Sequence, residues 1–232
     1  MDILQQFQTT EFWVGLLKII WINIILSGDN AVVIALAARS LPPDQQRKAI
    51  FWGTAAAVVL RIGLTVVAVK LLSLPYLEIV GGLLLLYIGV QLLGDENAGE
   101  GEAKVHGTLS SAIRTILIAD LVRSLDNVIG VAAAANGNIT LLVIGLAIAI
   151  PIVIFGSTLM IKLMERFPII ITLGAALIGW VGGETIVSDF ILRDFSAANP
   201  WVHYAAAVAG AVFVIAVGKF VAGRKQAHSA AA

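Results

Sequence analysis

Two copies of an acid–amide pair stand inside stretches that are otherwise apolar enough to cross a membrane. The copies are Ser27-Gly28-Asp29-Asn30 and Ser124-Leu125-Asp126-Asn127, and their acids are 97 residues apart. An ionised carboxylate at the centre of a bilayer costs about 2.5 to 3.5 kcal/mol even on the permissive scale derived from membrane insertion. Two such pairs therefore predict a functional site within the membrane.

The surroundings of the two pairs also correspond at the shift of 97 residues. This shift places Asn23 on Asp120, Ser27 on Ser124, Ala35 on Ala132 and Ala37-Ala38 on Ala134-Ala135. Further along the chain, a shift of 93 residues places Gly81 on Gly174, Tyr87 on Trp180, Gly89 on Gly182 and Gln91 on Glu184. The pattern indicates an internal duplication, with Gln91 and Glu184 as a further polar pair.

Oxygen atoms dominate the side chains of this set. The carboxylates are Asp29, Asp120, Asp126 and Glu184, the amides are Asn23, Asn30, Asn127 and Gln91, and the hydroxyls are Ser27 and Ser124. Hard oxygen ligands suit Mg²⁺, Ca²⁺ and Mn²⁺ better than copper or zinc. The set predicts a site for a hard divalent cation. The alternative is that these polar side chains only bond the helices to one another.

Helical geometry groups part of the set on one face. At 100° per residue, Asp120, Ser124 and Asn127 share a face, and Arg123 lies close enough to pair with Asp120 or Asp126. The four acids and Arg123 sum to a charge of minus three, or minus two if Arg61 also approaches. Arg61 is read either as a residue that extends to the membrane surface or as the counter-ion of a buried acid.

Composition identifies the setting of this site. The 232 residues are 59% hydrophobic and 13% charged, with a mean hydropathy of +0.95, whereas soluble domains are about 25% charged. A membrane core about 30 Å thick needs roughly 20 apolar residues per helix. Seven stretches qualify or nearly so, at about 12–38, 49–72, 77–93, 109–135, 139–161, 169–188 and 203–222. We expect an all-α membrane protein with seven transmembrane helices.

The duplication divides these helices into two repeats. Residues 1–93 form the first three-helix repeat, 94–108 a Gly/Glu-rich cytoplasmic linker, 109–192 the second repeat, and 193–232 the seventh helix and a cytoplasmic tail. Because each repeat has an odd number of helices, the second must be inverted relative to the first, as in many secondary transporters. The helices at 12–38 and 109–135 should then cross antiparallel, with Asn23 facing Asp120. Gly28 offers a point where the first helix could open. The seventh helix is expected to serve packing or contact between copies of the chain.

The distribution of Lys and Arg predicts the orientation. One side of the predicted bundle carries Arg39, Arg47, Lys48, Lys104, Arg114, Lys162, Arg166, Lys219, Arg224 and Lys225. The opposite side carries Lys70 and Arg193. The positive-inside rule therefore places the N-terminus outside and the C-terminus in the cytoplasm.

Several classes of function find no support in the residues. The chain has no cysteine, and His106, His203 and His228 are scattered, which disfavours disulfides, thiolate metal sites and a structural zinc site. No nucleotide-binding motif is present. We therefore expect neither an enzyme nor a nucleic-acid partner, and no tightly bound cofactor.

The two motifs, Ser27 to Arg39 and Asp120 to Ala134, resemble the TerC family of bacterial membrane proteins, specifically its compact YjbE-like branch. The resemblance covers the first six predicted helices. It implies a seven-helix fold of the LysE-like transporter group and an association with manganese export and tellurium resistance. By position, its acidic motifs fall on Asp29 with Asn30 and on Asp126 with Asn127, and Asp120 completes the second. Asn23 stands where the second half has Asp120, so the two halves are not expected to bind a cation equally.

The sequence thus favours a transporter of the bacterial inner membrane, in contact with lipid, that exports Mn²⁺ as its substrate in exchange for protons. Two alternatives remain open. One is an exporter of amino acids or other small solutes, in which Arg123 would hold a substrate carboxylate. The other is a membrane partner in stress response that transports nothing.

Overall fold

The computed structural model describes residues 10–71, 74–94, 108–135 and 139–229, and the regular elements within these ranges are all helices. They are α2 (Thr10–Ala38), α3 (Pro43–Leu71), α4 (Leu77–Gly94), α5 (Leu109–Ala135), α6 (Ile139–Arg166), α7 (Ile169–Ser188), α8 (Arg193–Ala198) and α9 (Trp201–Ser229). Each of the seven predicted stretches corresponds to one of the long helices, and α8 is an additional short one. The all-helical fold class is confirmed.

Some helices extend beyond the apolar stretches that predicted them. Helix α3 begins at Pro43 and has Asp44 in its first turn. Proline suits the first helical position because its missing N–H would have no partner there, and an acid in the first turn complements the helix dipole. Polar residues can therefore prolong a helix past the membrane core, which an apolar window does not detect.

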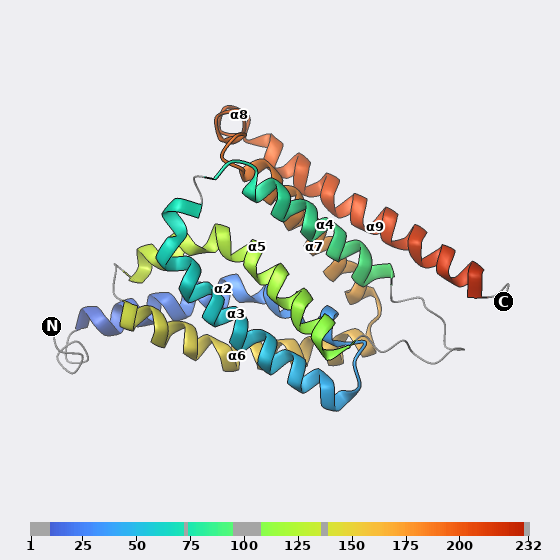
Figure 1. Cartoon of the computed structure of the whole chain (residues 1–232), viewed down its shortest axis with the longest axis horizontal. Helices are drawn as coiled ribbons and strands as arrows, with labels where there is room; N and C mark the ends of the chain where they lie inside the picture. Colours follow the sequence, from blue (N-terminus) through green and yellow to red (C-terminus); the bar gives the residue numbers. More distant parts are fainter. Residues whose placement is uncertain (1–9, 72–73, 95–107, 136–138, 230–232) are drawn as a thin grey trace.

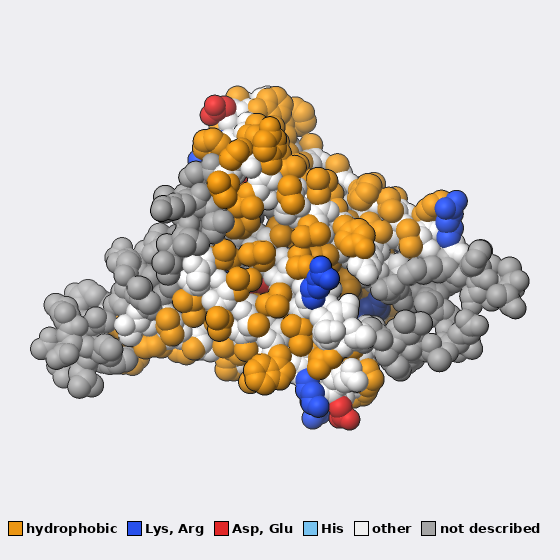
Figure 2. Space-filling view, in the orientation of Figure 1, with side chains coloured by type: hydrophobic (Ala, Val, Ile, Leu, Met, Phe, Trp, Pro, Cys, Tyr) orange, Lys and Arg blue, Asp and Glu red, His pale blue; other side chains and the backbone are white. Residues whose placement is uncertain are grey.

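Five of the helices in the described part of the chain are long and apolar enough to cross a membrane. These spans are Pro43–Thr65, Leu77–Gly94, Val143–Arg166, Ile169–Ser188 and Trp201–Arg224. Their outward faces carry large apolar side chains such as Val59, Phe155 and Tyr204, each about 70% exposed. Hydrophobic side chains are widespread on the face of the molecule that Figure 2 shows. The protein is an integral membrane protein.

The helices form two groups. Helices α4, α7 and α9 pack side by side, while α2 packs mainly on α6 and α3 mainly on α5. Figure 1 shows α2, α4, α6 and α9 running in one direction and α3, α5 and α7 in the other. Helices α2 and α5 are in contact and antiparallel, as the sequence predicts.

Glycines bring the backbones of the first group together. A Cβ atom on Gly82 of α4 would lie 2.5 Å from the carbonyl oxygen of Gly182 in α7, and one on Gly179 would lie 2.5 Å from that of Gly210 in α9. Small residues at such crossings allow close van der Waals packing, which is a main source of helix association in lipid. The group α4, α7 and α9 is therefore tightly packed, with no room for larger side chains at these crossings.

Asp189, which directly follows α7, caps the start of α4. It is fully buried, and its carboxylate accepts hydrogen bonds from the backbone N–H groups of Tyr76, Glu78 and Ile79, as well as Ile191, at 3.1 to 3.2 Å. Burial raises the pKa of this carboxyl, but the four N–H donors outweigh it and hold the pKa below its usual value of 3.8. Sequence analysis assigned Asp189 no role.

Asp189→Asn should lower the free energy of unfolding by about 1.5 to 3 kcal/mol at pH 7, the range for hydrogen bonds to a charged group. Because the folded protein lowers the pKa of Asp189, its contribution is present above the unfolded pKa and is lost as the pH falls through the folded pKa. Thermal unfolding of the solubilised protein between pH 7 and pH 3 tests this. Asp194→Asn, on the exposed first turn of α8, is the matched control, and equal unfolding temperatures for the two variants at pH 7 would contradict the assignment.

Candidate cation-binding site

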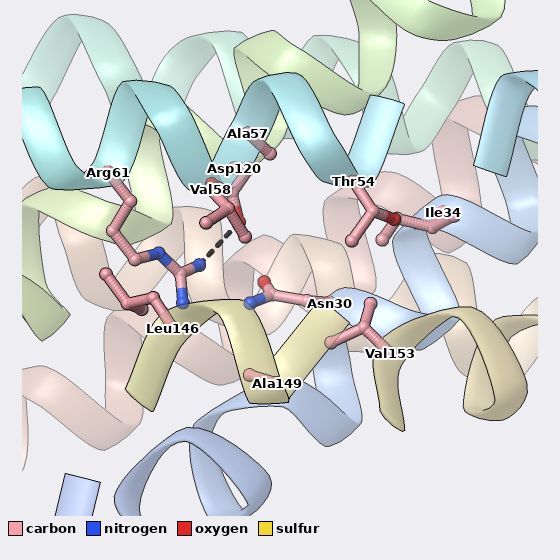
Figure 3. Close-up of a pocket in the computed structure, with 10 residues that line it drawn as sticks. All are labelled: Asn30, Ile34, Thr54, Ala57, Val58, Arg61, Asp120, Leu146, Ala149 and Val153. Atoms are coloured by element: carbon pink, nitrogen blue, oxygen red, sulfur yellow. Dashed lines mark hydrogen bonds and ion pairs between the residues drawn. The ribbon is translucent and has the colours of Figure 1, made fainter. Parts of the chain in front are cut away.

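A small cavity lies between four helices of the second group. Its volume is about 20 Å³, which is room for about one water-sized particle. It is lined by Asn30 and Ile34 from α2, Thr54, Ala57, Val58 and Arg61 from α3, Asp120 from α5, and Leu146, Ala149 and Val153 from α6 (Figure 3). Most of the lining is apolar, so the four polar side chains define its chemistry.

Arg61 and Asp120 form a buried ion pair at this cavity. The guanidinium Nη2 lies 2.5 Å from Asp120 Oδ1, and its Nε donates to Ser124 Oγ at 3.0 Å. Ser124 in turn donates to Asp120 Oδ2 at 3.1 Å. All three residues are at most 9% exposed. Both carboxylate oxygens of Asp120 therefore have a donor, which is the condition for burying a charge.

The spacing of residues along each helix explains this arrangement. Asp120 and Ser124 are four residues apart and so lie on one face of α5, and the spacing of seven residues puts Thr54 and Arg61 on one face of α3. Ala57 from α3 and Ala149 from α6 also line the cavity. Their short side chains leave space that a leucine would fill.

Thr54 of α3 contributes a buried hydroxyl that is not bonded to its own helix. Its Oγ1 is buried and has no hydrogen-bond partner among the described residues. In contrast, Thr65, Ser157 and Thr158 each donate to the backbone carbonyl four residues earlier at 2.8 Å, the usual arrangement for a hydroxyl inside a helix. Thr54 therefore lines the cavity with a hydroxyl that the helix backbone does not use. The signal that sequence analysis missed is its position two turns before Arg61 on the same face.

The structure brings together only part of the predicted set. Asn30 and Asp120 line the cavity, and Ser124, which does not line it, donates a hydrogen bond to Asp120. Asn30 is 5% exposed, and its side chain extends into the cavity toward Arg61 (Figure 3). The partner that the structure gives Asp120 is Arg61 from α3. This bears out the reading of Arg61 as the counter-ion of a buried acid, whereas the sequence allowed Arg123 to pair with either Asp120 or Asp126.

Two predicted ligands lie elsewhere. Gln91 of α4 and Glu184 of α7 are exposed and do not line the cavity. The physical reason is that the buried faces of these helices are made of glycines such as Gly82 and Gly182, which turns the polar side chains outward. Helix α2 is continuous through Gly28, so the expected opening of the first helix is not observed.

The remaining predicted residues cannot be placed by their side chains. Asn23 and Ser27 with Asp29 in α2, and Asp126 with Asn127 in α5, have side chains outside the described residues. Among the described residues, no three His, Cys, Asp or Glu side chains gather closely enough to hold a metal ion. The participation of Asp29 and Asp126 beside Asp120 at the cavity stays a prediction.

Comparison with known proteins identifies the family. Residues 8–226 match the integral membrane protein TerC family. The chain is 46% identical to the uncharacterized membrane protein YjbE of Bacillus subtilis (strain 168) over 205 residues, which cover 88% of this chain and 94% of that protein. It is 26% identical to the uncharacterized membrane protein YkoY of the same organism, over 81% of this chain and 63% of YkoY. It is also 23% identical to the UPF0053 inner membrane protein YgdQ of Escherichia coli (strain K12), over 83% of this chain and 87% of YgdQ. No solved structure matches. The YjbE-like resemblance is confirmed, and the chain belongs to the integral membrane protein TerC family.

Proposed function

We propose that this protein is a secondary transporter of the bacterial inner membrane that exports a hard divalent cation, Mn²⁺ first of all, in exchange for protons. The observation that carries the proposal is a buried carboxylate, Asp120, at a cavity between α2, α3, α5 and α6 that Asn30 and Thr54 also line. Asp120 is 11 residues beyond the start of α5, or about 16 Å along a helix about 40 Å long. A cation held there would lie deep within the membrane.

The chemistry of the donors supports a divalent cation. Asp120, Asn30 and Thr54 offer only oxygen atoms toward such an ion, and Asp29 and Asp126 stand beside or near these residues in α2 and α5 as further carboxylates. Oxygen ligands with carboxylates suit Mn²⁺ and Mg²⁺. The metal is the substrate, so it must bind and leave, and a carboxylate that takes up a proton in its place provides the exchange.

The packing of α2, α3, α5 and α6 supports two inverted repeats. A Cβ atom on Gly53 of α3 would touch Ile116 of α5, and one on Gly145 of α6 would touch Ile19 of α2. Ile19 and Ile116 are related by the shift of 97 residues, and Gly53 and Gly145 occupy equivalent places in the second helix of each repeat. Ala57 and Ala149 share the offset of these glycines and both line the cavity. The proposed site thus lies where the repeats meet, as in other inverted-repeat transporters.

The ends of the helices support the proposed orientation. The α2–α3 connection, the α6–α7 connection and the end of α9 lie toward the same end of the bundle, at the right of Figure 1. This end carries most of the Lys and Arg residues, including Arg39, Arg166 and Arg224. By the positive-inside rule it faces the cytoplasm, and the N-terminal end of α2 faces outward.

The size of the cavity supports a single ion rather than an amino acid as the substrate. A space of about 20 Å³ accepts a single ion or water, whereas an amino acid would need several helices to move apart. A partner in stress response would need no cavity with a carboxylate at all. Metal uptake into vesicles that contain only the purified protein separates the three functions.

Loss of a carboxylate should abolish transport. Asp120→Asn, Asp29→Asn and Asp126→Asn keep the size of each side chain but remove the charge that a divalent cation needs. Each variant should reach the membrane and lose at least about tenfold in Mn²⁺ export, which corresponds to about 1.4 kcal/mol. Uptake into everted membrane vesicles measures this, with Asp44→Asn on the exposed first turn of α3 as the control. Export at the parental rate would show that the tested residue is not a metal ligand.

Exchange for protons should make transport follow a pH gradient. Vesicles with an acidic interior should accumulate Mn²⁺ as protons leave. Each proton released to the outer solution regenerates a carboxylate, which can then bind Mn²⁺ from that solution. A protonophore that collapses the gradient should stop the accumulation. Accumulation that is indifferent to the gradient would show uniport.

The inverted repeats should give Asp29 and Asp126 opposite accessibility. The chain has no cysteine, so Asp29→Cys and Asp126→Cys each introduce one thiol. An impermeant thiol reagent applied from the cytoplasmic side should label position 29 faster, and the same reagent applied from outside should label position 126 faster. Equal labelling patterns for the two variants would contradict the inverted arrangement.

A further inference from the structure

The described cavity carries a positive charge where a cation is proposed to bind. The guanidinium of Arg61 lies against Asp120 and Ser124, so the described charges at the cavity, one of each sign, cancel. A divalent cation beside Asp120 would meet the positive charge of Arg61 at close range in a medium of low dielectric constant. Among the described charges, Arg61 and a divalent cation would therefore compete for the same carboxylate.

We propose that the Arg61 side chain is a tethered cation that occupies the metal site when no metal is bound, and that a divalent cation binds only after Arg61 has left Asp120. The inference extends the proposed function, since it presupposes that Asp120 receives the transported metal. It assigns Arg61 as the residue against which the metal competes, and thus as a determinant of affinity and specificity.

The contacts of Arg61 fit this role. It is anchored in α3, but the groups that hold its guanidinium, Asp120 and Ser124, both belong to α5. The same oxygen atoms would be ligands for a hard cation. Arginine does not lose its proton in proteins, so the site can gain net negative charge at Asp120 only if the guanidinium moves away.

With Thr54 and Asn30 as ligands, an incoming metal ion would connect a different set of helices than Arg61 does. In the present arrangement Arg61 connects α3 to α5. A metal on Asp120 that also took the Thr54 hydroxyl and the Asn30 carbonyl would instead join α5 to α3 and α2 around the cavity (Figure 3). Metal and Arg61 would thus stabilise two different packings of these helices, which is what a ligand must do to drive a conformational change.

Equilibrium binding of Mn²⁺ to the purified full chain at a single pH tests the competition. Arg61→Ala should bind Mn²⁺ about tenfold more tightly than the parent, within the usual range of coupling between two ligands. Arg61→Lys should fall between the two, because an ammonium keeps the charge but lacks the planar fork that reaches Asp120 and Ser124 together. Asp120→Asn should bind at least about tenfold more weakly.

Added guanidinium ion provides a further test, because it should not change Mn²⁺ binding if the role of Arg61 is only structural. In Arg61→Ala, the free ion at tens of millimolar should re-enter beside Asp120 and weaken Mn²⁺ binding toward the parental value. Sodium chloride at the same concentration should do so much less, and neither salt should act specifically on the parent, whose site already holds its own guanidinium.

The outcomes separate this inference from the function on which it rests. Mn²⁺ affinity that is unchanged or lower in both Arg61→Ala and Arg61→Lys overturns the competition, while a parent that binds and transports Mn²⁺ keeps the proposed function. A parent that neither binds nor transports Mn²⁺ overturns both. If Arg61→Ala does not fold, Arg61→Lys decides, since it preserves the charge pair, and an affinity no higher than that of the parent overturns the proposal.

Discussion

A charge inside an apolar helix bundle must find its counter-charge within the bundle, and the second group of helices is arranged around that requirement. Arg61 and Asp120 meet across α3 and α5, with Ser124 bonded to both. Removing one member of such a pair typically costs about 3 to 5 kcal/mol, whereas an apolar pair of the same size is often neutral or stabilising. Stability alone therefore does not account for the pair. Its place at a cavity that Asn30 and Thr54 also line is the feature on which the proposed function rests.

The two groups of helices differ in how they are held together. In α4, α7 and α9, glycines bring backbones into contact, and Asp189 ties the end of α7 to the start of α4. In α2, α3, α5 and α6, by contrast, a cavity and a buried ion pair lie between the helices. Tight glycine packing resists rearrangement because each displacement loses many contacts. Motions that carry a cation through the protein would accordingly fall on the four helices around the cavity.

Sequence periodicity and polarity were enough to predict the helices and part of the site. Long apolar runs predicted the seven long helices, and the four-residue spacing of Asp120 and Ser124 predicted their shared face. Which arginine meets Asp120 was not predictable, because helical angles relate residues of one helix but not residues of different helices. Arg123 shares α5 with Asp120, yet Arg61 from α3 reaches it.

Correspondence between the repeats also has limits as a guide to burial. Gln91 and Glu184 occupy equivalent positions, but equivalence does not say which face of a helix is buried, and both are exposed. Thr54 has no polar counterpart in the second repeat and drew no attention, because a lone threonine in an apolar helix usually bonds its own backbone. Only the packing of four helices shows that Thr54 lies at a cavity.

The neutrality of the Arg61–Asp120 pair has an electrical consequence. The membrane potential acts on net charge, at about 2.3 kcal/mol per elementary charge for each 100 mV. An intact pair that moves across the field performs no net electrical work, whereas an unpaired Asp120 would be pulled or held by the voltage. If the proposed transport holds, the Arg61–Asp120 pair would add no voltage dependence to the return step without cargo, and voltage would act on this pair only in the steps in which it is open.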